Sequence, residues 1–66
     1  MWYYNYIGGQ QIHKRQRSLV DAIESARALA MWYGDVETRN RKGRTIFYTQ
    51  GVGTETYNHA EQPARF

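Results

Sequence analysis

The sequence predicts an α+β fold in which one helix covers one face of a four-stranded antiparallel sheet, in the chain order β-β-α-β-β. Three observations lead to this prediction: a glycine pair between two strand-like segments in residues 2–16, helical periodicity over residues 18–34, and a second glycine-containing turn within residues 36–49. With 66 residues the chain has room for a single domain.

The first hairpin is predicted from the segments Trp2 to Ile7 and Gln10 to Gln16, which flank Gly8-Gly9. A two-residue turn there pairs Ile7 with Gln10, Tyr6 with Gln11, Asn5 with Ile12, Tyr4 with His13, Tyr3 with Lys14 and Trp2 with Arg15. Strand alternation then places Tyr3, Ile7 and Ile12 on one face, and Trp2, Tyr4 and Tyr6 on the other. The sequence leaves open which of these faces the helix covers.

The helix is predicted between Ser18, a favourable N-cap residue, and Gly34, a typical residue just beyond a helix end. Asp21 supplies an acidic group in the first turn. One side of this helix is apolar, and the residues that form it are Leu19, Ala22, Ile23, Ala26, Leu29, Ala30 and Tyr33.

A second hairpin is predicted from Val36 to Arg41 and Arg44 to Thr49, with Gly43 in its turn. In chain order the four predicted strands are numbered 1 (2–7), 2 (10–16), 3 (36–41) and 4 (44–49). A right-handed crossover through the helix makes strands 2 and 3 parallel, and pairing strand 3 beside strand 1 gives the spatial order 2-1-3-4. Residues 1–50 then form the domain, and the polar, aperiodic residues 51–66 are interpreted as a flexible C-terminal tail.

These elements resemble those of small, largely uncharacterised β-β-α-β-β proteins of actinobacteria and their phages. The resemblance covers residues 2–50 and is carried by Trp2, Tyr6 and Gly9, then Ser18-Leu19, Asp21-Ala22, Ala26, Leu29-Ala30 and Gly34, and finally the hairpin at Gly43. It implies a compact sheet-and-helix fold and a phage origin. It implies no activity and supplies no functional residues.

Several kinds of chemistry lack the residues they need. The chain has no cysteine, and its two histidines, His13 and His59, are 46 residues apart, so no metal site is expected. Neither Ser18 nor Ser25 belongs to a nucleophile motif. We therefore expect no catalytic residue, no cofactor and no enzymatic activity. The sequence shows no signal peptide and no apolar run of membrane-spanning length, so a cytoplasmic location is expected, in the host if the protein is phage-encoded.

Basic residues are concentrated in two short segments. The first contains Lys14, Arg15 and Arg17, and the second contains Arg39, Arg41, Lys42 and Arg44. In the 2-1-3-4 order both segments meet at one rim, at the end where the helix begins. A rim of this kind suits nucleic-acid phosphate or an acidic partner, although basic turns also serve simply to keep a small protein soluble.

The ten aromatic residues exceed what one helix can cover. If Trp2, Tyr4 and Tyr6 face outward, they could stack on the bases of a single-stranded nucleic acid; alternatively they pack in the core or in a dimer. Trp32, Tyr33, Phe47 and Tyr48 are candidate interface residues. We expect a homo-oligomer that forms through the uncovered sheet face or through strand 4 as an open edge.

The sequence as a whole favours a small, non-enzymatic binding protein that acts on an unidentified host or phage protein. A nucleic-acid binder that uses the basic rim and a structural homo-oligomer are the alternatives.

Overall fold

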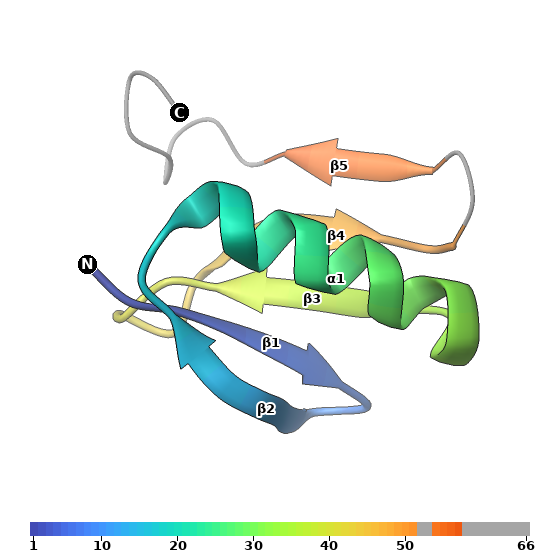
Figure 1. Cartoon of the computed structure of the whole chain (residues 1–66). Coiled ribbons are helices and arrows are strands. Elements are labelled where there is room, and N and C mark those ends of the chain that lie inside the picture. Colours follow the sequence, from blue (N-terminus) through green and yellow to red (C-terminus); the bar gives the residue numbers. More distant parts are fainter. Residues whose placement is uncertain (52–53, 58–66) are drawn as a thin grey trace.

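The computed structural model describes residues 1–51 and 54–57, which form one sheet with one helix against it (Figure 1). The elements are β1 (Tyr3–Ile7), β2 (Gln10–Gln16), α1 (Leu19–Tyr33), β3 (Val36–Arg39), β4 (Thr45–Thr49) and β5 (Glu55–Tyr57). The strands lie in the order β2-β1-β3-β4-β5, and all neighbours are antiparallel. The predicted α+β class and 2-1-3-4 order are confirmed, and a fifth strand lies beside β4.

The two ends of α1 lie where the sequence predicts them. Ser18 has an extended backbone, and its Oγ accepts a hydrogen bond from the backbone N–H of Asp21 at 3.4 Å. At the other end Gly34 has a φ of 86°, and its N–H donates to the carbonyl oxygen of Ala30 at 3.0 Å.

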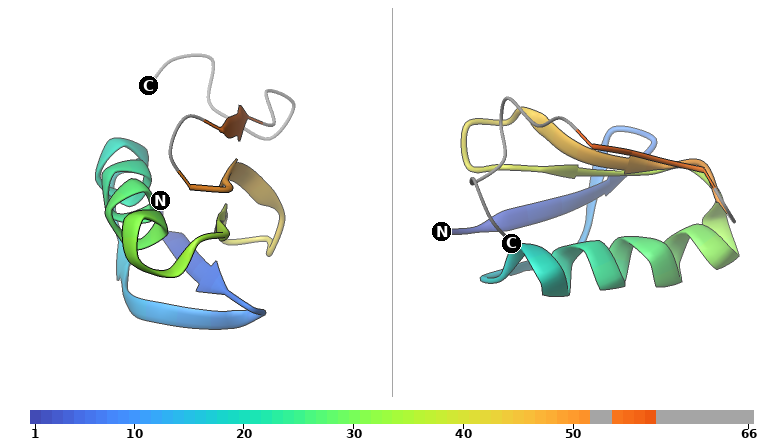
Figure 2. Two further views of the ribbon diagram at one scale, coloured as in Figure 1. Left: turned by 90° about the vertical axis from the view of Figure 1, so that its right-hand side faces the viewer. Right: turned by 90° about the horizontal axis from the view of Figure 1, so that it is seen from above.

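The helix lies on one face of the sheet, as both views of Figure 2 show. It buries Leu19, Ala22, Ile23, Ala26, Leu29 and Ala30. The small alanines let the helix approach the sheet closely, where the core includes Tyr3, Val36, Ile46 and Phe47. Tyr33, which the sequence places on the same apolar side, is instead 67% exposed. The buried stripe ends at Ala30, one turn before the helix does, so the ring of Tyr33 stays in solvent.

The first hairpin turns at Gly8 and Gly9, whose φ angles of 58° and 81° are those a two-residue primed turn requires. The predicted pairs Ile7–Gln10, Tyr6–Gln11 and Asn5–Ile12 are confirmed. Beyond them the predicted register is wrong, because Tyr3 pairs with Gln16 instead of Lys14.

A bulge in β2 causes this shift. His13 within it has a φ of 61°, a conformation that residues other than glycine seldom adopt. The bulge shifts the pairing by two residues, so the alternation of β2 is preserved, and Ile12 and Gln16 lie opposite the helix-facing Asn5 and Tyr3. Because β2 has one aliphatic residue, its apolar pattern alone could not specify this register.

The second hairpin is shorter than the sequence predicts. Its strands end at Arg39 and restart at Thr45. The side chain of Asn40 closes the turn, because its Oδ1 accepts hydrogen bonds from the backbone N–H of Lys42 at 2.9 Å and of Arg44 at 3.1 Å. The backbone N–H of Asn40 also donates to the carbonyl oxygen of Arg44 at 2.9 Å, so the turn is closed by both backbone and side-chain hydrogen bonds.

Strand β5 is the main departure from the predicted fold. The sequence predicts a tail over residues 51–66, but Glu55–Tyr57 pairs with β4, so β4 is not the sheet edge. The ring of Tyr57 packs on that of Phe47 with the centroids 5.0 Å apart. The pairing supplies hydrogen-bond partners for the amides of β4, and the ring contact buries apolar surface. The sequence does not predict this strand, because three residues are too few to show a period. Residues 52–53 and 58–66 of the predicted tail lie outside the described residues.

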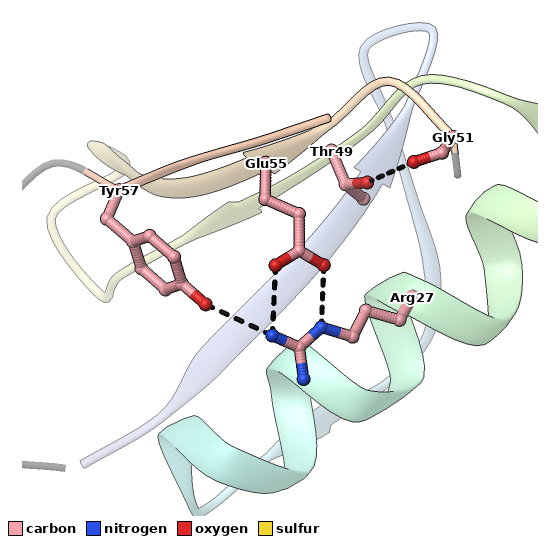
Figure 3. A network of polar contacts seen from close by, with 5 residues as sticks. All are labelled: Arg27, Thr49, Gly51, Glu55 and Tyr57. Carbon is pink, nitrogen blue, oxygen red and sulfur yellow. Dashed lines mark hydrogen bonds and ion pairs between the residues drawn. The ribbon is translucent and has the colours of Figure 1, made fainter. Parts of the chain in front are cut away.

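Arg27 ties β5 to the helix (Figure 3). Its Nε donates to Glu55 Oε2 at 2.6 Å, and its Nη2 donates to Glu55 Oε1 at 2.9 Å and to the Tyr57 hydroxyl at 3.1 Å. The hydrogen bonds from Arg27 lower the pKa of Glu55, against the smaller effect of burial. Arg27 therefore links the middle of α1 to β5 through a bidentate salt bridge and one further hydrogen bond.

Within the described part of the chain, no helix combines the length and the apolar character needed to cross a membrane.

Candidate functional site

The topology brings the two basic segments to one end of the molecule. Strands β2 and β3 both run antiparallel to β1, so they point the same way and end at the same edge, where α1 also begins (Figure 1). We call this set of side chains the basic rim; it consists of Lys14, Arg15 and Arg17 from β2 and the residues after it, and Arg39, Arg41, Lys42 and Arg44 from β3 and the β3–β4 turn.

The basic rim is open to solvent. All of its side chains are exposed except that of Arg39, which is half-buried. Lys14, Arg17 and Arg41 form no ion pair with another described residue. The positive end of α1 is already served by Ser18 and by Asp21 in its first turn, so the anion-binding capacity of this end comes from the basic side chains.

The sheet face opposite α1 carries the second half of the site. Asn5, Thr38 and Phe47 pair across the strands and face the helix, so the adjacent row of paired residues points away from it. That row contains Gln11, Tyr6, Glu37, Tyr48 and Thr56. The next row toward the rim contains Tyr4, Arg39 and Thr45. We call these two rows the open face.

The structure therefore decides which set of aromatic residues the helix covers. Tyr3 is buried beneath α1, and Ile7 and Ile12 are half-buried against the same core. Tyr4 and Tyr6 point to the other side and are half-buried within the open face. They are thus not part of the core, and of the placements that the sequence left open, base stacking and a dimer contact remain.

A salt bridge with Glu37 and a contact with Tyr6 hold Arg39 on the open face. Its guanidinium carbon lies 4.0 Å from the centroid of the Tyr6 ring, and its Nε donates to Glu37 Oε1 at 2.9 Å. The hydroxyl of Thr45 donates to the other carboxylate oxygen at 2.5 Å. Burial alone would raise the pKa of Glu37, but the hydrogen bonds from Thr45 and Arg39 outweigh it and lower that pKa. Glu37 therefore stays ionised at neutral pH and holds Arg39 by the salt bridge.

Trp2 connects the aromatic residues with the basic rim. It immediately precedes β1, and the guanidinium carbons of Arg15 and Arg17 lie 3.8 Å and 5.1 Å from its ring centroid. Two cations of the rim are thus held next to an indole. This end of the molecule combines positive charge, which binds phosphates, with a flat aromatic ring, on which bases stack.

The four candidate interface residues separate into three locations. Trp32 and Tyr33 are 83% and 67% exposed at the end of α1, and the neighbouring Met31 is 74% exposed. Tyr48 is half-buried on the open face. Phe47 is fully buried between the helix and Tyr57, so the prediction that it offers an interface ring is wrong. Its position on β4 puts it on the helix side of the sheet.

Sequence reasoning missed the Glu37–Thr45–Arg39 arrangement. The alternation of Glu37 and Arg39 within one strand was a usable signal, because residues two apart on a strand share a face. Their partners Tyr6 and Thr45 come from other strands, so the arrangement depends on the register of the sheet.

The described residues contain no group of three side chains suited to hold a metal ion. His13 is exposed in the bulge of β2 and is not part of a group of potential metal ligands among these residues.

No family model matches this chain, and no curated protein or solved structure matches it either.

Proposed function

We propose that this protein binds nucleic acid through the basic rim. The observation that carries the proposal is the meeting of two basic segments, remote in sequence, at one end of the sheet. Exposed lysines and arginines bind phosphates and release the counterions condensed on the nucleic acid, so such binding weakens steeply as salt rises. The Trp2 ring beside Arg15 supports the proposal, because it places an aromatic group next to these charges.

The test is fluorescence anisotropy with labelled duplex and single-stranded DNA and RNA at about 50 mM and about 200 mM salt. We expect binding at low salt that weakens at high salt. The double variant Arg41→Gln/Lys42→Gln should bind more weakly. Its plot of log affinity against log salt should be shallower by about one unit for each phosphate that the variant no longer neutralises.

The matched control is Ala28→Glu/Gln50→Glu, which changes the net charge by the same amount at exposed positions away from the rim. This control should retain the wild-type salt slope. The absence of binding to every probe at low salt would remove the proposal.

A second candidate function is contact with a protein. It is favoured by the consecutive exposed side chains of Met31, Trp32 and Tyr33 at the end of α1. Apolar side chains exposed together at one end of a helix can contribute to an interaction surface. The partner would be a host or phage protein or a second copy of this chain. Strand β4 offers no open edge for dimerisation, since β5 pairs with it.

A further inference from the structure

We infer that the nucleic acid held at the basic rim is single-stranded and that its bases stack on the open face of the sheet. This inference rests on the proposed function, because the rim supplies the phosphate contacts. It adds the substrate class: a strand with unpaired bases, of DNA or RNA.

The open face presents flat groups at regular intervals. Tyr6 and Tyr48 occupy one row on either side of Glu37, and Tyr4 lies in the next row toward the rim. Neighbouring strands are about 4.8 Å apart, and residues two apart along a strand are separated by about 6.6 Å. Tyr4, Tyr48 and the Arg39 group that lies over Tyr6 can each take one splayed base, while the bases of a duplex remain stacked on each other.

Arg39 supplies one of these platforms. The guanidinium carbon lies over the Tyr6 ring, 4.0 Å from its centroid, and Glu37 anchors the group by a salt bridge. The side chain is 30% exposed, and the surface of the guanidinium turned away from Tyr6 can receive a base. Bases stack on arginine planes as well as on aromatic rings. Tyr6 and Glu37 thus position Arg39, whereas Tyr4, Tyr48 and Arg39 meet the bases.

The charge of the open face agrees with this assignment. Glu37 is its acidic residue, and the salt bridge with Arg39 together with the hydrogen bond from Thr45 compensates that charge. Arg15 lies over Trp2 where the aromatic surface meets the rim. A nucleic-acid strand whose phosphates lie at the basic rim therefore meets no uncompensated carboxylate on the open face.

The test compares three labelled probes by anisotropy: a single-stranded oligonucleotide, the same backbone with abasic sugars, and the matching duplex. DNA and RNA versions of the first probe show which of the two nucleic acids binds more tightly. We expect wild type to bind the single strand about tenfold or more tighter than the abasic strand. Tyr4→Ala and Tyr48→Ala should each reduce that preference by about five- to a hundredfold and leave abasic binding unchanged.

Two further variants keep the result decisive. Trp32→Ala removes an exposed ring at the end of α1, away from the open face, and should retain the full preference. Tyr48→Leu keeps most of the apolar volume without a flat ring, so it separates the loss of stacking from a perturbed fold, and circular dichroism checks that each variant folds.

Equal affinity for the single strand, the abasic strand and the duplex would overturn base stacking while leaving the rim proposal intact. A drop in affinity in the tyrosine variants that is the same for abasic and base-bearing probes would also overturn it. Failure of all probes to bind would overturn both proposals.

Discussion

The buried side chains of Asn5 and Thr38 are hydrogen-bonded to each other across β1 and β3, directly beneath the helix. Thr38 Oγ1 donates to Asn5 Oδ1, and Asn5 Nδ2 donates to the carbonyl oxygen of Ala22 at 3.1 Å. Three elements of the core are thus joined by two hydrogen bonds. The polar atoms are satisfied, so this position specifies how the helix sits on the sheet without leaving an unpaired buried group.

Thr38→Val should therefore destabilise the protein by about 1–3 kcal/mol, because it leaves Asn5 Oδ1 buried without this donor. Urea denaturation followed by circular dichroism measures the change. Thr56→Val, at an exposed position of β5, is the matched control and should lie within about 0.5 kcal/mol of wild type. Equal stability of the two variants would show that the Asn5–Thr38 bond contributes nothing measurable.

Gly34→Ala should destabilise the protein by about 1–3 kcal/mol. The φ of 86° at this position is one that a side chain adopts only with strain, and no atom lies within 4 Å of where a Cβ would be. The cost therefore comes from the backbone rather than from a clash. Thermal unfolding measures it, and an unchanged midpoint would contradict the argument.

Acid should weaken the fold through Glu37 and Glu55. Against the opposing effect of burial, hydrogen bonds from Thr45 and Arg39 lower the pKa of Glu37, and hydrogen bonds from Arg27 lower the pKa of Glu55. A lowered folded pKa stabilises the fold above the ordinary glutamate pKa of about 4.3, and this contribution disappears as pH falls through the folded value. The urea midpoint measured from neutral pH downward should fall less steeply for Glu37→Gln and Glu55→Gln than for wild type. Parallel curves would contradict the prediction.

Arg27→Ala should loosen β5 selectively. The guanidinium is the group that joins Glu55 and Tyr57 to the helix, so its removal leaves β5 held by its ladder with β4 and the contact of Tyr57 with Phe47. Hydrogen exchange should become faster at the amides of Glu55–Tyr57 and stay unchanged in β1 and β3. Glu24→Ala, an exposed change on the same helix, serves as the control.

Self-association, if it uses the end of α1, should respond to Trp32→Lys. The ring is 83% exposed, so its replacement removes no core contact and places a charge between the exposed Met31 and Tyr33 in the sequence at the end of α1. Light scattering should report a wild-type mass above 7.8 kDa that rises with concentration, and a monomeric mass for the variant. A wild-type mass that stays at the monomer value would rule out the homo-oligomer.

Much of the fold could be predicted because its signals are local. Gly8 and Gly9 fix a hairpin turn, and Ser18 and Gly34 fix the ends of the helix, each through the conformation of a few neighbouring bonds. The connection rule for two strands joined through a helix then implies that β2 and β3 end together, and this is why the meeting of the two basic segments was predictable.

The tertiary structure decided what depends on pairing between distant segments. The bulge at His13, the strand at Glu55–Tyr57 and the side of the sheet beneath α1 were fixed by packing and register. The strand alternation determined only that Tyr3 lies on the face of the sheet opposite to Tyr4 and Tyr6. A period of two assigns residues to faces without saying which face is buried. Core packing decided which face α1 covers, because the alanine side of the helix fits against Tyr3, Val36 and Phe47. Tyr4 and Tyr6 therefore lie on the open face with Arg39.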